Sequence, residues 1–255
     1  MRELHNGFDQ VNFEAAVEAA EADEGLRRYM LGIYNKVGLG LALAAGTAAT
    51  TAGVPALRDL LFTTVAHGAG APRIGLTLLG AMLAFAPLVL LLFSGSVVSK
   101  PTPVRTGVLY WSVTTLIGAS LGILCLLYTG VSIAITLMVS ALGFAAMSLI
   151  GYTTKRCLTG AGSFLTMAVI GLVLSLGANI VLHSSAIAYV TGLVGVVAFA
   201  GLIACDSQRL KLAYHRLGGD EGSLAVATNL GALSLFINFV NLFQFLLMFA
   251  SGNRR

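Results

Sequence analysis

One acidic residue of this 255-residue sequence lies within a long apolar run, where a carboxyl group is suited to take up a proton or to bind a cation. Of the 11 acidic residues, seven occur before residue 25, and Asp59, Asp220 and Glu221 occupy polar breaks between apolar runs. The remaining one, Asp206, lies in the segment Leu-Ile-Ala-Cys-Asp-Ser-Gln-Arg-Leu at 202–210. A charge in hydrocarbon costs at least about 2.5–3.5 kcal/mol on insertion scales, so one that persists usually faces a bundle interior or a water path. We therefore interpret Asp206 as a proton-sensitive gate element or a ligand for a hard cation.

The sequence leaves a second interpretation of Asp206 open. Arg209 follows three residues later, and residues at this spacing are neighbours on the surface of a helix. In this interpretation Asp206 is a carboxylate at a helix end, near the inner membrane surface, that pairs with Arg209. The two interpretations predict different burial of Asp206: inside the bundle in the first, and near water in the second. Burial matters because a carboxyl group removed from water favours its neutral form.

Polar side chains in the last apolar run offer a partner for Asp206. Ser234, Asn238 and Asn241 stand at positions i, i+4 and i+7, on one stripe of a helix, and Gln244 lies one turn further along. In lipid, such side chains commonly hold helices together through hydrogen bonds. The alternative is that the stripe lines a cation pathway facing Asp206, and Asn179 in the fifth apolar run is a candidate for either role.

The residue inventory does not support enzyme chemistry. A serine hydrolase needs a nucleophile, a base and an orienting acid at one site, and His183 with Ser184 and Ser185 has no acidic residue near it in the sequence. An intramembrane aspartyl protease needs two carboxylates in the membrane, and a retinal photoreceptor needs a lysine in its last span. Neither condition is met, so we predict no enzymatic activity, no catalytic residues and no bound cofactor.

The composition indicates that the solvent of this chain is largely lipid. Hydrophobic residues make up 57% of the chain and charged residues 10%, against about 25% charged residues in soluble domains. The mean hydropathy is +0.88. The formal net charge is +4, and the basic residues occur in ones and twos between the apolar runs. Basic residues in such positions orient a protein in the bilayer, and this pattern does not indicate nucleic-acid binding.

The apolar runs predict an all-α membrane protein, a bundle of seven transmembrane helices. Each run is long enough for a crossing of about 20 residues, and none alternates as the strands of a β-barrel do. The predicted spans are 30–53, 74–93, 106–126, 131–152, 162–182, 186–208 and 228–250, with the last break at 207–227. Residues 1–29 form a polar, acidic N-terminal arm, and residues 30–255 form the transmembrane domain.

The basic residues predict the orientation of the bundle. With the N-terminus in the cytoplasm, the inner segments hold Arg2, Arg27, Arg28, Lys36, Lys100, Arg105, Lys155, Arg156, Arg209, Lys211 and Arg216, and the outer segments hold Arg58, Arg73, Arg254 and Arg255. Basic residues collect on the cytoplasmic side of membrane proteins. We expect a cytoplasmic N-terminus and an outer C-terminus; a re-entrant last span would reverse the latter.

Four ordered motifs resemble those of a known membrane protein family. They are Leu26–Asn35 at the first span, Gly151–Arg156 with Gly162–Leu165 around the fourth break, Asp206–Lys211, and Ala232–Phe243 in the last span. On these motifs the chain resembles a bacterial member of the Bax inhibitor family, the transmembrane Bax-inhibitor-motif proteins, from about residue 24 to the end.

The resemblance implies a pH-sensitive calcium leak channel of the inner membrane, gated by an aspartate pair on the sixth and seventh helices. Asp206 matches the first aspartate, whereas Asn238 stands in place of the second, which weakens pH sensing but still offers an amide oxygen to Ca²⁺. Relatives tend to have a basic residue near the cytoplasmic end of helix two, where Lys100 is the first candidate. The alternative is a non-conducting protein that modulates a membrane-bound ATP-dependent protease.

Overall fold

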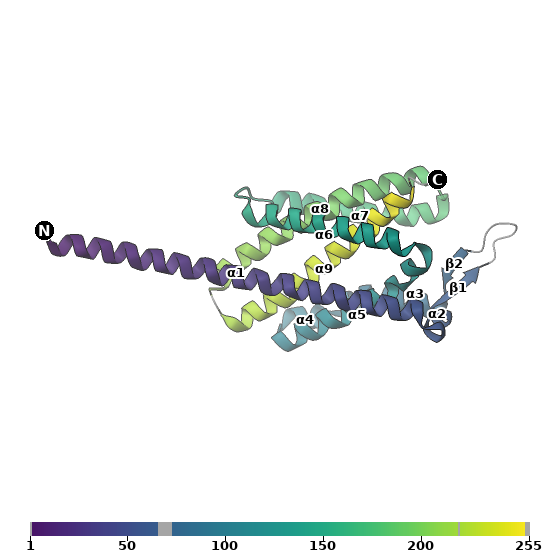
Figure 1. Ribbon diagram of the computed structural model, residues 1–255, viewed down its shortest axis with the longest axis horizontal. Helices are drawn as coiled ribbons and strands as arrows, with labels where there is room; N and C mark the ends of the chain where they lie inside the picture. The colour runs from purple at the N-terminus through teal and green to yellow at the C-terminus, as the bar shows by residue number, and fades with distance from the viewer. Residues whose placement is uncertain (1, 66–72, 219, 253–255) are drawn as a thin grey trace.

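The computed structural model of the chain describes residues 2–65, 73–218 and 220–252, and it is built mainly of long helices (Figure 1). Side chains are described from residue 24 onward. Arg254 and Arg255, on which part of the predicted orientation rests, lie outside the described residues. The elements are α1 (Arg2–Gly53), α2 (Pro55–Leu61), β1 (Phe62–Val65), β2 (Arg73–Leu76), α3 (Leu78–Phe93), α4 (Gly95–Ser99), α5 (Pro103–Leu127), α6 (Gly130–Thr153), α7 (Thr159–Leu182), α8 (Ser185–Leu217) and α9 (Glu221–Gly252).

In the described part of the chain, five helices are individually long and apolar enough to cross a membrane: α5, α6, α7, α8 and α9. A sixth crossing is possible if the end of α1 and α2, which are bent by 89° at Val54, count as one span. The prediction of an all-helical membrane protein is therefore confirmed, but the count of seven spans is not. The predicted span 74–93 contains α3, which has 16 residues and is shorter than the roughly 20 residues of a full crossing.

The predicted break at 207–227 is wrong. Helix α8 continues to Leu217, and α9 begins at Glu221. Gly218 ends α8 with a positive φ of 59°, a conformation that glycine adopts without strain. Asp220 then caps α9 by accepting a hydrogen bond of 2.8 Å from the backbone N–H of Ser223, and its hydrogen bonds to Ser223 lower the pKa of this carboxyl group.

A short hairpin lies between α2 and α3, in the first predicted break (54–73) and at the start of the predicted span 74–93. Strands β1 and β2 pair in antiparallel fashion, with Phe62 opposite Leu76 and Thr64 opposite Ile74. The hairpin follows α2 directly, and Thr77 at its end caps α3 by accepting a hydrogen bond from the N–H of Gly80. The sequence analysis did not predict this hairpin.

Helix α9 forms much of the interior of the bundle. It packs against α1, α5, α6 and α8, and its residues Ala232, Leu235 and Phe236 are fully buried. Large hydrophobic side chains elsewhere are exposed, including Phe93 at 79% and Val181 at 79%. Exposure on this scale fits a molecule whose outer surface is covered by lipid.

Glycines in the third predicted span allow α5 to pack closely against α1. A Cβ atom built on Gly118 would lie 2.4 Å from Ala44 Cα, and one on Gly122 would lie 3.1 Å from the carbonyl oxygen of Ala48. Small residues permit such close approach of helices in membranes.

We expect Gly118→Leu to lower the midpoint of thermal unfolding in detergent by several degrees, because overpacking costs about 1–3 kcal/mol. Gly46→Leu is the matched control, since a Cβ atom on Gly46 in α1 meets nothing within 4 Å. Equal midpoints for the two variants, measured by tryptophan fluorescence or scanning calorimetry, would contradict this account of the α1–α5 contact.

Candidate functional site

Asp206 lies inside the bundle and not at the end of its helix. It precedes the last residue of α8, Leu217, by 11 positions, which corresponds to about 16 Å along the helix axis. Its residue surface is 7% exposed. The continuation of α8 past residue 208 is what places the carboxylate here, three turns before the helix ends.

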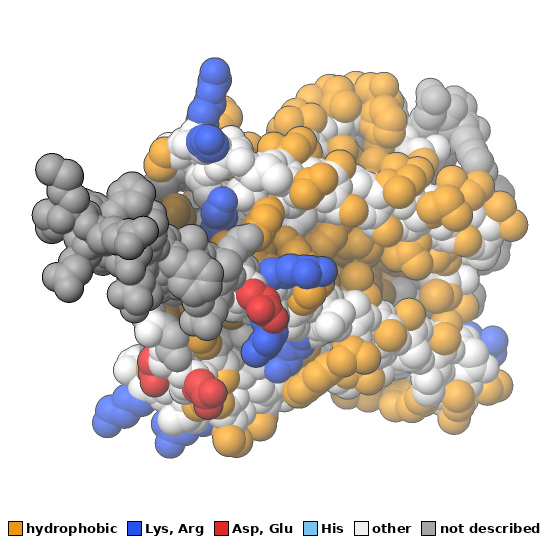
Figure 2. Space-filling view, turned by 60° about the vertical axis from the view of Figure 1, so that its left-hand side comes forward, with side chains coloured by type: hydrophobic (Ala, Val, Ile, Leu, Met, Phe, Trp, Pro, Cys, Tyr) orange, Lys and Arg blue, Asp and Glu red, His pale blue; other side chains and the backbone are white. Residues whose placement is uncertain are grey.

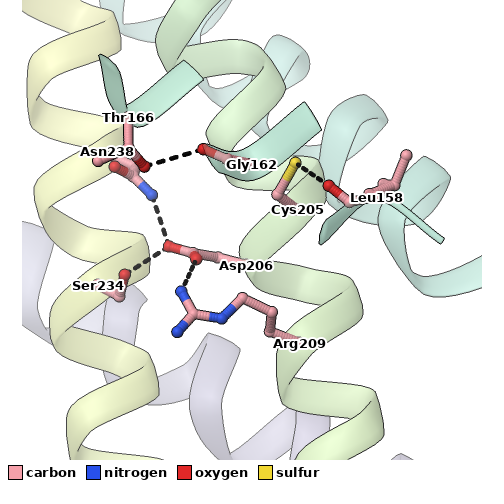
Figure 3. Close-up of polar contacts among 8 residues, drawn as sticks. All are labelled: Leu158, Gly162, Thr166, Cys205, Asp206, Arg209, Ser234 and Asn238. Carbon is pink, nitrogen blue, oxygen red and sulfur yellow. Dashed lines mark hydrogen bonds and ion pairs between the residues drawn. The ribbon is translucent and has the colours of Figure 1, made fainter. Parts of the chain in front are cut away.

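The carboxylate of Asp206 joins α8 to α9 (Figure 3). Its Oδ2 atom accepts a hydrogen bond of 2.8 Å from Nδ2 of Asn238 and another from the hydroxyl of Ser234. Its Oδ1 atom accepts one of 3.2 Å from Nη1 of Arg209. The structure thus brings four of the predicted site residues together. The carboxylate pairs with Arg209, as the second interpretation predicted, but it lies three turns before the end of α8 and faces the last helix.

Arg209 connects the buried carboxylate to the surface. Its side chain is 76% exposed, against 10% for that of Asp206, so water screens this ion pair more than a buried one. Arg209 lines two pockets. One, of about 270 Å³ between α7 and α8, also contains Asp206 and Gly162. The other, of about 820 Å³, lies where the α8–α9 turn meets the start of α5 at Pro103.

Two other predicted site residues lie apart from Asp206. Nδ2 of Asn241 donates a hydrogen bond of 2.9 Å to the carbonyl oxygen of Ile237 in its own helix. Oδ1 of Asn179 accepts one of 2.9 Å from the N–H of Ser184 in the turn between α7 and α8, at the opposite end of α8 from the Asp206 site. Asn241 and Asn179 therefore make local hydrogen bonds within a helix and a turn.

The basic partner of Asp206 comes from its own helix. Lys100, the candidate suggested by the family pattern, caps α4 at an exposed position. Among the residues that the structure describes, the salt bridge of Asp206 is made by Arg209. The basic partner of Asp206 is thus an arginine one turn away on α8 and not a residue near the end of the second helix.

Neighbours of Asp206 on α8 hold the loop between α6 and α7. The side chain of Gln208 donates a hydrogen bond of 2.7 Å to the carbonyl oxygen of Arg156 and accepts one of 2.8 Å from the N–H of Leu158. Nζ of Lys211 donates one of 2.9 Å to the carbonyl oxygen of Tyr152. These side chains position the loop that forms one wall of the 270 Å³ pocket, which contains Leu158.

Two polar networks that sequence reasoning missed tie α1 to the site helices. Oη of Tyr34 and Oγ of Ser148 are 2.6 Å apart, and Oγ of Ser148 is 2.8 Å from Oγ of Ser207, the residue after Asp206. On the other side of α1, Nζ of Lys36 donates a hydrogen bond to Oδ1 of Asn229 in α9. Lys36 had the same signal as Asp206, a charged residue within a predicted span.

The side chains around Asp206 supply only part of the ligand shell of a metal ion. The described residues contain no group of three or more His, Cys, Asp or Glu side chains that could hold a metal ion. Asp206, Ser234 and Asn238 supply one carboxylate, one hydroxyl and one amide, whereas Ca²⁺ takes six to eight oxygen ligands. Water would have to complete the shell of a cation at this site.

Long apolar helices around a carboxylate shared by two of them define a polytopic membrane protein with a polar site in its interior. Residues 26–255 match the sequence model of the family described as "Inhibitor of apoptosis-promoting Bax1". The chain therefore belongs to the Bax inhibitor family, as its motifs predicted.

Relatives match over nearly their whole length. A protein of Caulobacter vibrioides is 53% identical over 232 residues, which cover 91% of each chain. The inner membrane protein YbhL of Escherichia coli is 38% identical over 232 residues, covering 91% of this chain and 94% of YbhL. A membrane protein of Streptococcus pyogenes is 32% identical over 234 residues, covering 91% of this chain and 96% of the relative.

Proposed function

We propose that this protein is a slow calcium leak of the inner membrane, closed by the hydrogen bonds and ion pair of Asp206. The observation that carries the proposal is the buried carboxylate of Asp206. Its two oxygens accept hydrogen bonds from Arg209 in its own helix, α8, and from Ser234 and Asn238 in α9. Intramembrane carboxylates of this kind mark ion or proton pathways. Membership of the Bax inhibitor family supports the same function. The name of the Escherichia coli relative, an inner membrane protein, supports the proposed location in the inner membrane.

The proposed closed state depends on the negative charge of Asp206. Ionised, the carboxylate accepts hydrogen bonds from Ser234, Asn238 and Arg209 together. Protonation removes the charge that attracts Arg209 and turns one acceptor oxygen into a donor, so the link between α8 and α9 weakens. Arg209 is then free to turn into the 820 Å³ pocket that it already lines, and the space beside Asp206 opens to hydrated cations.

The proposed arrangement in the membrane has seven crossings with a cytoplasmic N-terminus. Helix α1 begins and α9 ends at opposite ends of the molecule (Figure 1), as an odd number of crossings requires. This count takes α1 with α2 as one crossing and the short α3 as another. The excess of basic residues in the predicted inner segments supports the orientation.

Calcium entry into proteoliposomes tests the function. With the purified protein and a calcium indicator inside the vesicles, we expect entry above that of protein-free vesicles. It should be modestly faster at pH 6 than at pH 8, because the proposed closed state depends on the negative charge of Asp206. Entry equal to that of protein-free vesicles at both pH values would contradict the leak and favour the non-conducting interaction role.

A further inference from the structure

An apolar groove runs between α1 and α6 along the side of the bundle. Two pockets, of about 550 Å³ and 620 Å³, form it, and they adjoin at Tyr34 and Phe144, which line both. Figure 2 shows an apolar hollow in the molecular surface with basic side chains gathered near its end. The groove therefore opens to the surroundings of the helices and is not an enclosed cavity.

Small residues on α1 create the groove. Gly38, Ala42 and Ala45 line it from α1, and a Cβ atom on Gly38 would meet nothing within 4 Å. Its floor comes from α9, through Phe239 and Phe243, which are 3% and 8% exposed. Nearly all side chains along the 620 Å³ part are apolar, so the groove suits a hydrocarbon chain and not a polar solute.

The groove is about as long as the hydrocarbon core of a bilayer is thick. On α1 its lining extends from Arg27 to Ala48, which corresponds to about 32 Å at about 1.5 Å per residue. The hydrocarbon core of a bilayer is about 30 Å thick. An acyl chain that enters at one membrane surface can therefore lie within the groove for its whole length.

A positive charge lies at one end of the groove. Arg27 lines the 550 Å³ part and is exposed. Its neighbour Arg28 pairs with Glu24 at 3.2 Å, whereas no carboxylate among the described side chains forms a salt bridge with Arg27. Guanidinium groups bind phosphate through paired hydrogen bonds, so this end of the groove has the chemistry to hold a phosphate group.

We infer that the groove between α1 and α6 binds one phospholipid, with an acyl chain along Gly38, Phe144 and Phe239 and the phosphate at Arg27. The combination of a positively charged end with a long apolar body fits a phospholipid, whose phosphate is anionic and whose acyl chains are apolar. The site is independent of the proposed leak, although its floor lies on α9 beside Asn238.

Photo-crosslinking in nanodiscs tests the site. The probe is phosphatidylglycerol with a diazirine on one acyl chain, diluted in phosphatidylcholine, and labelled peptides are identified by mass spectrometry. We expect labelling of α1 and α6 peptides that line the groove to exceed labelling of α7, which is almost wholly exposed to lipid. Equal labelling of α1, α6 and α7 would show annular lipid only and would overturn the inference.

Adjacent alanines on α6 give a matched pair of variants. Ala145 lines the groove and Ala146 is exposed outside its lining. Ala145→Trp should reduce labelling of the groove about tenfold, since excluding two methylene groups already costs about that factor, and Ala146→Trp should leave it unchanged. Native mass spectrometry in detergent should show one retained phospholipid for the latter and none for the former; equal retention would overturn the inference.

Arg27→Gln separates the phosphate contact from the acyl chain. Because Arg27 is exposed, this change should not disturb folding, and it should lower groove labelling by phosphatidylglycerol about tenfold, the loss expected for a charge-assisted hydrogen bond. Labelling of α7 serves as the internal reference. Unchanged groove labelling would overturn the assignment of the phosphate to Arg27.

Discussion

Asp206→Asn is expected to raise calcium entry at pH 8 about tenfold and to remove most of the difference between pH 6 and pH 8. The amide has nearly the shape of the carboxyl group but carries no charge, so it resembles the protonated state at every pH. It loses the ion pair with Arg209 and cannot accept hydrogen bonds at both of its terminal atoms. Hydrogen bonds to charged groups contribute about 1.5–3 kcal/mol, and 1.4 kcal/mol is already tenfold.

Asp59→Asn is the control for this change in charge. Asp59 lies in α2 beside Arg58, exposed and at the far end of the bundle from Asp206, so its variant should conduct like the natural protein. Gel filtration of all variants would show that they remain folded. If Asp206→Asn conducts like the natural protein at both pH values, the carboxylate does not hold the closed state.

Arg209→Gln distinguishes the ion pair from the other two hydrogen bonds of Asp206. It should raise entry at pH 8 by less than Asp206→Asn does, because Ser234 and Asn238 still donate to the carboxylate and the pair is largely exposed. The remaining pH dependence should persist in this variant. Its loss would place the sensor at Arg209 and its surroundings instead.

The residues of the site could be chosen from the sequence because each stood out against its surroundings. Asp206 is an acid in an apolar run, and Ser234 and Asn238 share a helix face by their spacing. That Asn241 and Asn179 bond within their own helix and turn could not be predicted, since spacing places a side chain on a face but does not choose its hydrogen-bond partner. Every amide side chain in an apolar run stands out from the sequence in the same way, whichever partner it bonds to.

Other features depend on contacts between distant parts of the chain. Residues 207–216 looked like a loop because they are polar. Gln208, however, bonds to the α6–α7 loop and Lys211 bonds to Tyr152 in the last turn of α6, between 50 and 59 residues earlier, and these bonds favour the helix. The pairing of Lys36 with Asn229 spans 193 positions. The groove between α1 and α6 arises from the distance between two helices. A local sequence pattern does not predict that distance.

The identity of residue 238 should set the direction of the pH response. In the natural protein, Nδ2 of Asn238 donates a hydrogen bond to Oδ2 of Asp206, and the amide carries no charge. In Asn238→Asp, two carboxylates lie at this distance and share one proton. Losing that proton leaves two like charges facing each other across α8 and α9 and removes a hydrogen bond between them.

We therefore expect Asn238→Asp to admit calcium about tenfold faster at pH 8 than at pH 6, opposite in direction to the natural protein. Two charges about 4 Å apart repel by roughly 4 kcal/mol at an effective dielectric constant of 20, so a tenfold effect needs only part of this energy. A second carboxylate also supplies another ligand for Ca²⁺, which should raise the apparent calcium affinity at pH 8.

Asn241→Asp separates this coupling from the general effect of an added charge in α9. It places a carboxylate one turn further along the same helix, where the natural side chain bonds to Ile237 and not to Asp206. Its pH profile should keep the weak dependence of the natural protein. A reversed profile in both variants would mean that any acid in α9 controls entry, and the specific pairing across α8 and α9 would then not be the gate.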